Sequence, residues 1–292
     1  MTTTDIALIN ADDYAALVAA SGASAEDLSG GGGDYLPQLK VNYQDEDPNG
    51  KELKVGYFVV TGQDPAVYAK NVTIRPLTHN FQWTQYDKEE EKVVNRTRFV
   101  KNFREEARDE KGTIRCGKPA SKILKESPEL AKQYSDVTLY RNIDVLVSYT
   151  GEDADGNTHE VKDLLATMRL KGANFSPFQE EYIDNMPKNT MLWDFPVRLS
   201  VTKHKQDPKS VVSYYVVHFD ADFTNRLVMS VDVFETIKAL HGRIDTFNKD
   251  IDKKYYTVID ERSKSEAALK ALDASPAKDL LDDFKSSDDI PF

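Results

Sequence analysis

The chain has 292 residues, 40% of them hydrophobic and 30% charged, which is typical of a soluble globular protein with a sizeable core. It contains no run of about 18 apolar residues that would indicate a transmembrane helix. It also lacks a basic region followed by an apolar stretch near its N-terminus, so we do not expect secretion. The single cysteine, Cys116, excludes an internal disulfide and a multi-cysteine zinc site, and it predicts a reducing, cytoplasmic location.

The net charge of −11 is unevenly distributed. Residues 1–34 hold six acidic and no basic residues, and residues 271–292 hold six acidic and two basic ones. Removing these contributions of −6 and −4 leaves residues 35–270 with a net charge of −1. A nearly neutral body can carry a basic groove on one face, so the acidic total does not exclude a nucleic-acid ligand.

Residues 1–34 are interpreted as a flexible acidic arm. An alanine-rich stretch over 5–20 predicts one short, weak helix, and the glycines of 29–33 predict a flexible linker after it. The apolar residues of the stretch include Ile6, Leu8, Ile9, Leu17 and Val18. The arm is expected either to be disordered or to dock on a neighbouring subunit.

The body, residues 35–260, reads as a series of strands joined mostly by hairpins, with helices inserted between some of them. Period-two alternation predicts strands at 53–60, 67–77, 137–149, 160–170, 191–201 and 210–223. Capping patterns and apolar spacing predict helices at 119–126, 128–134, 178–186, 231–247 and 264–272. This pattern is mainly β and permits an antiparallel barrel with helical decorations. Arg141 interrupts the inward face of 137–149, either buried and paired or pointing into a binding groove.

A hairpin predicted over 79–104 interleaves exposed aromatic and basic residues, which suits single-stranded nucleic acid because bases stack on rings while cations follow phosphates. The alternative is an ordinary sheet with Phe81 and Trp83 in the core and the arginines in water. Arg75 lies on the outward face of the preceding strand. The DNA-binding residues predicted from this region are Arg75, Phe81, Trp83, Tyr86, Arg96, Arg98, Phe99, Lys101 and Phe103.

Residues 112–118 fit the first seven positions of a phosphate-binding P-loop, but Pro119 stands where the Mg²⁺-binding hydroxyl is required. A charged stretch also precedes it in place of a buried strand. We therefore interpret the segment as a basic loop in which Arg115, Lys118 and Lys122 contact phosphates. A plain turn leading into the helix at 119–126 is the alternative.

His218, Asp220 and Asp222 share one strand face, which could ligate Mg²⁺ or Mn²⁺ in a nuclease or could be an ordinary polar surface. The five histidines show no zinc spacing, and no base is paired with Cys116. We therefore predict no catalytic residue, no metal and no cofactor, and hence no enzyme.

Residues 261–292 are interpreted as a disordered acidic tail that ends in an apolar tripeptide. The five residues Asp288-Asp289-Ile290-Pro291-Phe292 resemble the acidic tip of bacterial single-stranded DNA-binding proteins, with Asp282, Asp283 and Phe284 as a looser extension. Lys285, Ser286 and Ser287 depart from the usual unbroken acidity. The other interpretation is a solvated tail that only adds charge.

The resemblance implies an oligonucleotide-binding (OB) fold that coats and protects single-stranded DNA during replication, recombination and repair. It implies that the tip recruits partner enzymes through a ring-binding pocket and a basic rim. The partner-binding residues would be Asp282, Asp283, Asp288, Asp289, Ile290, Pro291 and Phe292. The large body and the missing Gly/Gln/Pro-rich linker suggest a divergent, phage-encoded member acting in the host cytoplasm. The alternatives are a metal-dependent nuclease and an interaction protein that does not bind DNA.

Overall fold

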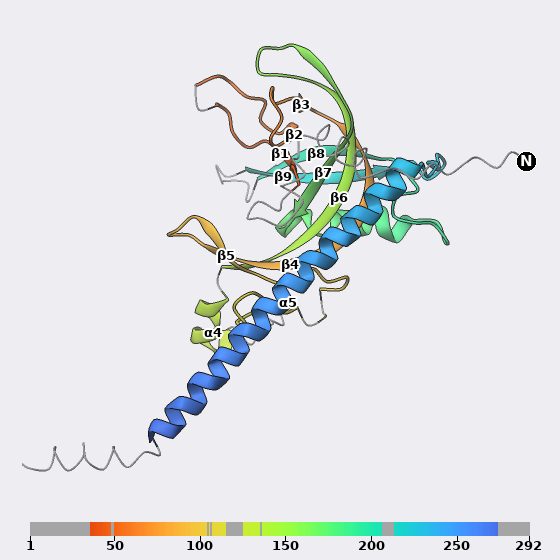
Figure 1. Cartoon of the computed structure of the whole chain (residues 1–292). Helices are drawn as coiled ribbons and strands as arrows, with labels where there is room; N and C mark the ends of the chain where they lie inside the picture. The colour runs from red at the N-terminus through yellow and green to blue at the C-terminus, as the bar shows by residue number, and fades with distance from the viewer. Residues whose placement is uncertain are drawn as a thin grey trace, which may run out of the picture.

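The computed structural model describes residues 36–47, 50–103, 105, 107–114, 125–134, 136–205 and 213–273. Within these ranges the protein is mainly β, with one sheet and one long helix (Figure 1). The strands are β1 (Leu39–Val41), β2 (Phe58–Val60), β3 (Tyr68–Ala69), β4 (Val72–Asp87), β5 (Lys92–Arg96), β6 (Val137–Glu152), β7 (Thr158–Leu170), β8 (Val197–Lys205) and β9 (Ser213–Ala221). The helical elements are α4 (Pro128–Gln133), η1 (Gly172–Asn174), η2 (Phe178–Tyr182), η3 (Ile183–Asn185) and α5 (Val231–Asp273).

The nine described strands form one sheet, paired throughout in the antiparallel sense and not closed into a barrel. Its main order is β1-β2-β3-β6-β4-β8-β9, with β5 added to β4 and β7 added to β6. The longest pairings join β6 to β4 on one side and to β7 on the other. The β6–β7 hairpin has a tight loop because the Asp153 carboxylate accepts hydrogen bonds from the backbone N–H groups of Asp155 and Asn157.

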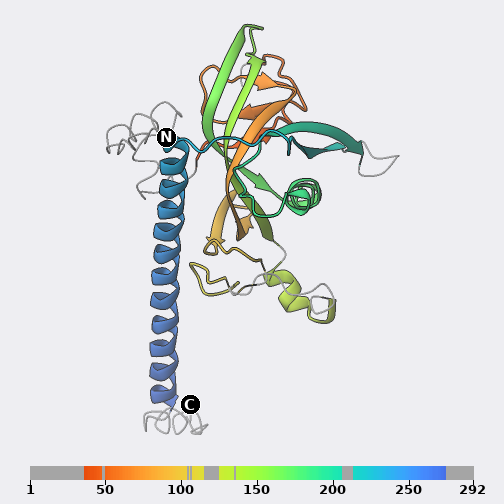
Figure 2. The ribbon, with the colours of Figure 1, turned by 90° about the vertical axis from the view of Figure 1, so that its right-hand side faces the viewer.

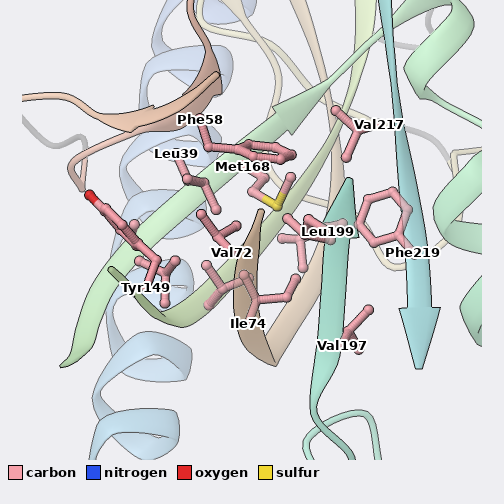
Figure 3. Close-up of a cluster of buried hydrophobic side chains, with 14 of the residues drawn as sticks. Leu39, Phe58, Val72, Ile74, Tyr149, Met168, Val197, Leu199, Val217 and Phe219 are labelled. Carbon is pink, nitrogen blue, oxygen red and sulfur yellow. The ribbon is translucent and has the colours of Figure 1, made fainter. Parts of the chain in front are cut away.

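The core lies on the concave side of this sheet, where side chains from β1, β2, β4, β6, β7, β8 and β9 converge (Figure 3). Alternation explains the convergence, since every second residue of β6 points inward and the register sets those residues against inward residues of β4 and β7. Phe178 and Tyr182 of η2 cap the same cluster and are fully buried. These contacts fix the relative positions of the strands that carry the candidate site.

Helix α5 has 43 residues and packs its first turns on the other face of the sheet, as the clustering of Val233, Ile237 and Leu240 with sheet residues shows (Figures 1 and 2). The Ser230 hydroxyl accepts a hydrogen bond from the Val233 N–H at 3.3 Å, which caps the first turn. One stripe of the helix is buried and is spaced three, four or seven residues apart, as a helical face requires. It consists of Val233, Ile237, Leu240, Ile244, Ile251 and Tyr255.

The first turns of α5 pack on the sheet and its middle packs on an irregular segment. Val233, Ile237 and Leu240 contact Leu77, Leu146 and Leu165 of the sheet, together with Leu36. Farther along, the Arg262 guanidinium donates to the backbone carbonyls of Lys111 (2.7 Å) and Gly112 (3.2 Å). In Figure 2 the far end of the helix extends well past the strands.

Several predicted elements are corrected by the structure. The strand predicted at 191–201 begins only at Val197, and Met191, expected to face inward, is 57% exposed. The reason is a turn held by Asp194, whose carboxylate accepts from the Met191 N–H (3.0 Å) and pairs with Arg226 (2.8 Å). The helices predicted at 231–247 and 264–272 are one continuous helix, so the boundary drawn at residue 260 falls inside α5.

The strand predicted at 53–60 is likewise shorter and covers only β2, while 67–77 divides into β3 and the start of β4. The helix predicted at 178–186 is a π-helical turn followed by a 3₁₀ turn. None of the helices among the described residues combines the length and apolar character that a bilayer crossing requires.

Candidate nucleic-acid interface

The predicted hairpin over 79–104 is present as β4 and β5, paired from Thr84↔Arg96 to Asp87↔Lys92. A register shift between Gln85 and Tyr86 marks a bulge near its tip. Tyr86, one of the predicted DNA-binding residues, is 44% exposed there. Beyond β5, Val100 pairs with Phe81 through an isolated bridge, so the chain returns alongside β4.

Unlike Tyr86, the β4 residues Phe81 and Trp83 are not exposed as predicted. Phe81 is only 5% exposed and clusters with Val100 and Ala107, and the half-buried Trp83 packs on the same group. The expectation of an exposed Phe81 is therefore wrong. Its cause is the chain that returns after β5, where Val100 and Ala107 pack on Phe81 and turn an apparent binding surface into a small core.

Three arginines at the end of β5 and after it contact side chains of α5. Arg98 forms an ion pair with Asp252 at 3.0 Å, and Arg108 reaches the other oxygen of that carboxylate at 3.3 Å. Arg96 pairs with Glu110 at 3.3 Å and stacks over the ring of Phe247 at 5.1 Å.

The backbone of Phe99 is also tied to α5, because its N–H donates to the Asn248 side chain, whose amide donates back to the Phe99 carbonyl. The Phe99 ring packs on Phe247, with the ring centroids 4.9 Å apart. Arg96, Arg98 and Phe99 thus anchor the helix to the sheet.

Arg75 lies apart from the hairpin. Its guanidinium donates to the backbone carbonyls of Trp193 (2.8 Å) and Val228 (3.2 Å). Burial lowers its pKa, and the nearby charge of Asp194 opposes that shift. The structure therefore gives Arg75 a role in holding the connection that leads into α5.

Lys101 and Phe103 are exposed at the edge of the aromatic cluster. Phe103 is 38% exposed and makes edge-to-face contacts with Phe81 (5.3 Å) and Phe175 (6.0 Å). Partial burial lowers the pKa of Lys101, while the negative charges of Asp144 and Asp245 raise it. An exposed ring beside a cation is the combination that a stacked base and its phosphate require.

Behind Phe103 lies a buried arginine enclosed by phenylalanine rings. Arg141 is 3% exposed, and its guanidinium lies 5.1 Å from the ring centroid of Phe81, 4.9 Å from Phe175 and 5.8 Å from Phe178. It donates one hydrogen bond, to the Gln179 side chain at 3.2 Å. Burial lowers its pKa to about 10. Of the two alternatives for Arg141, the structure shows burial, with aromatic faces taking the place of a carboxylate.

His79 lies in the same group of rings. It makes edge-to-face contacts with Phe81 and Phe178 at 4.8 and 5.4 Å. Burial lowers its pKa to about 3, and the positive charges of Arg141 and Lys101 add to the shift. The imidazole is therefore neutral at physiological pH.

On the opposite face of the sheet lies a group of residues that the sequence analysis did not select. The half-exposed ring of Tyr140 on β6 is faced by the Arg169 guanidinium of β7 at 4.3 Å and by the Lys171 ammonium at 5.6 Å. We call these three residues the cationic tyrosine cluster. They lie on the face that α5 covers at Leu146 and Leu165. The sequence did carry a signal for this group, because the alternation in 137–149 and 160–170 places Tyr140 and Arg169 on the outward face.

A second basic group lies where β8 ends and β9 begins. Lys203, His204 and Lys205 are exposed, and His204 stacks on Tyr214 across the strand pair at 5.5 Å. These three basic residues end strand β8 and are not among the DNA-binding residues predicted from the sequence. Figure 2 shows this hairpin projecting from the sheet on the side away from α5.

The remaining predicted contacts lie outside the described residues. These are the phosphate contacts Arg115, Lys118 and Lys122 and the partner-binding residues Asp282, Asp283, Asp288, Asp289, Ile290, Pro291 and Phe292.

The proposed metal-binding face of β9 has other partners. His218 Nδ1 lies 2.9 Å from Glu181, and the Asp222 carboxylate accepts from the backbone N–H and hydroxyl of Thr224. Over the part of the chain that the structure describes, no group of three or more His, Cys, Asp or Glu side chains is placed to hold a metal ion.

Comparison with protein-family models, with curated proteins and with solved structures found no match to this chain.

Proposed function

We propose that this protein binds single-stranded DNA without acting as an enzyme, coats and protects it during replication, recombination or repair, and recruits partner enzymes through its C-terminal tip. The observation that carries the DNA-binding part is the cationic tyrosine cluster. An aromatic ring flanked by two cations offers a base a stacking surface and its phosphates a positive charge. The recruiting function rests on the C-terminal sequence Asp288–Phe292.

The fold that we propose for the body is an elaborated OB fold, a five-stranded and partly open Greek-key barrel. Its support is the pairing order β7-β6-β4-β8-β9. In a Greek key the fourth strand returns to lie beside the first, and β8 lies beside β4 in this way. The added strands β1–β3 and helix α5 are then elaborations of that core.

If the body is an OB fold, the cationic tyrosine cluster corresponds to the oligonucleotide-binding face of that fold. In the OB fold the face of the second and third strands, with the loops after the first and fourth strands, binds oligonucleotides. Counting from β4, those strands are β6 and β7, and the loops follow β4 and β8. Tyr140 and Arg169 lie on the strand pair, Lys171 directly follows β7, and Lys203, His204 and Lys205 are the last residues of β8, directly before the second loop.

The test is a stoichiometric fluorescence titration of the full chain with oligo-dT, with a duplex of the same length as control. Trp193 packs in the cluster that contains Leu146 and Leu165, on the face that carries Tyr140, whereas Trp83 packs with Phe81 on the opposite face, so a Trp83→Phe variant assigns the signal to Trp193. We expect saturable binding that favours the single strand and weakens steeply with salt. Equal affinity for duplex and single strand would contradict the proposal.

A cleavage assay with Mg²⁺ tests the absence of catalysis. We expect neither DNA cleavage nor ATP hydrolysis. Cleavage abolished by Asp220→Ala together with Asp222→Ala would instead assign the protein to the metal-dependent nucleases.

A further inference from the structure

An apolar surface lies where the chain enters α5. Val228 is 85% exposed, Phe234 is 55% exposed, and Met229 and Val231 between them are each 37% exposed. Val231 and Phe234 lie one helical turn apart, so they share a face of the helix. We call these four residues the α5 entry patch. Single exposed apolar residues are common on protein surfaces, but four within seven residues indicate a surface that another segment covers.

The adjoining face of the helix is already covered, in part by the beginning of the described chain. Leu36 is 2% exposed and packs in the cluster that contains Val233, Ile237 and Leu240. Leu36 is also the first residue that the structure describes. The 35 residues before it therefore leave the body beside the first turns of α5, next to the patch.

We propose that residues 5–20 of the same chain bind the α5 entry patch. Tyr14, Leu17 and Val18 have the i, i+3, i+4 spacing of an apolar helix face, and Ile6 and Ile9 are also one turn apart. An amphipathic helix laid against an exposed apolar face is a recurring mode of peptide recognition.

The tether is long enough for this contact. Residues 21–35 form a linker of 15 residues that includes four consecutive glycines. Its root-mean-square length is about 20 Å and its maximum reach is about 50 Å. Since Leu36 and Val233 belong to one packed cluster, the patch is within reach, and a tether of this length gives an effective concentration in the millimolar range.

The charges around the patch separate this surface from the proposed DNA interface. Asp232, Glu235 and Lys238 border it, two acidic residues and one basic residue, so the patch lacks the basic rim that a DNA interface requires. The arm itself carries six acidic residues and no basic ones, which makes it a poor ligand for DNA. Apolar burial therefore drives the contact, and its affinity depends little on salt, in contrast to DNA binding.

The experiment uses a fluorescently labelled peptide of residues 1–22 and a chain that lacks residues 1–20. We expect saturable anisotropy binding to the truncated chain and at least about tenfold weaker binding to the full chain, whose own arm occupies the patch. Val228→Ser with Phe234→Ser in the truncated chain abolishes binding. Val55→Ser is the matched control, because Val55 is also an exposed valine (38%) but lies elsewhere. Equal binding to the truncated and full chains overturns the proposal, as does binding that survives the double serine variant.

Hydrogen exchange on the full chain gives a second readout that does not depend on the truncation. The amides of residues 5–20 are expected to exchange faster in the Val228→Ser, Phe234→Ser variant than in the unaltered chain. Because both side chains are exposed, the unfolding midpoint of the truncated chain stays the same. Identical exchange in the two chains overturns the proposal. A concentration-dependent dimer that the double variant abolishes also overturns it, because the arm then binds a second copy.

Discussion

The Arg98 guanidinium lies 3.0 Å from the Asp252 carboxylate, which joins the segment after β5 to the middle of α5 across 154 residues of sequence. The second oxygen of the same carboxylate holds Arg108 at 3.3 Å. The Asp252 carboxylate thus forms ion pairs with two of the arginines that follow the β4–β5 hairpin. The position of α5 therefore determines how much positive charge Arg98 and Arg108 present to a polyanion such as DNA.

Asp252→Asn is expected to lower the free energy of unfolding by about 1 kcal/mol, since it weakens two partly buried ion pairs. It should also tighten DNA binding at low salt, because two arginines lose their counter-charge. Urea denaturation and an oligo-dT titration measure the two effects. Asp260→Asn is the control, since Asp260 pairs with Lys264 on the exposed side of the helix and should change neither quantity. Equal effects of the two variants would contradict the role given to Asp252.

His79 is expected to make stability depend on pH in the acidic range. Burial lowers its pKa in the folded state to about 3, against about 6.5 in the unfolded chain, so below pH 6.5 the unfolded chain binds a proton that the folded one does not. The stabilising contribution is complete above pH 6.5 and is lost progressively as the pH falls toward 3.

His79→Phe removes this proton uptake and keeps an aromatic ring among Phe81 and Phe178. Its free energy of unfolding should fall less steeply between pH 6.5 and 4.5 than that of the unaltered protein, by up to about 1.4 kcal/mol per pH unit. Denaturant unfolding at several pH values measures the slope. His204→Phe, at an exposed position, should leave it unchanged. A slope that is the same in His79→Phe would show that the buried imidazole does not control it.

The cationic tyrosine cluster predicts a specific pattern of DNA affinities. Tyr140→Ala should weaken oligo-dT binding by about 1–3 kcal/mol, because a stacked base loses its ring. Tyr140→Phe keeps the ring and should bind nearly as well as the unaltered protein. Lys171→Gln should reduce the slope of log affinity against log salt by about one, as expected for one lost phosphate contact. If all three variants bound DNA equally, the interface would lie elsewhere.

The sequence predicted the sheet better than it predicted which residues are exposed. Alternation located β6 and β7 well, because their registers place alternate residues against inward residues of neighbouring strands. The same alternation in β4 suggested exposed rings, since nothing in the local pattern shows that Val100 and Ala107 return to cover Phe81. Exposure at a site is decided by contacts distant in sequence, and local periodicity does not report them.

Two other differences have the same origin. Asp194 lies within the strand predicted at 191–201, but in the structure it is buried because it closes a turn and pairs with Arg226. Tyr140 was passed over because a single aromatic residue on an outward face is unremarkable until Arg169 and Lys171 of the next strand are known to lie against it. The hairpin pairing brings these residues together.

The C-terminal tip makes the fourth prediction. Deleting residues 282–292 should leave the unfolding transition unchanged, tighten DNA binding at low salt and abolish binding of replication or repair enzymes that recognise such tips. Deleting Phe292 alone should abolish partner binding and leave DNA affinity nearly the same, because all the aspartates remain. Pull-down and titration of the two truncations measure these effects. Partner binding that survives both would show that the tail only adds charge.

The length of α5 has a geometric consequence for this recruitment. The helix spans about 64 Å, and it continues for 11 residues, or about 16 Å, beyond Arg262, whose guanidinium bonds to the body at Lys111 and Gly112. The segment that carries the tip therefore starts at the end of a rigid helix. The length of that helix sets the distance of this starting point from the sheet, and the helical rotation sets its direction. Adding one heptad beyond Arg262 would move that origin outward by about 10 Å with little rotation, whereas adding five residues would turn it to the other side of the helix axis.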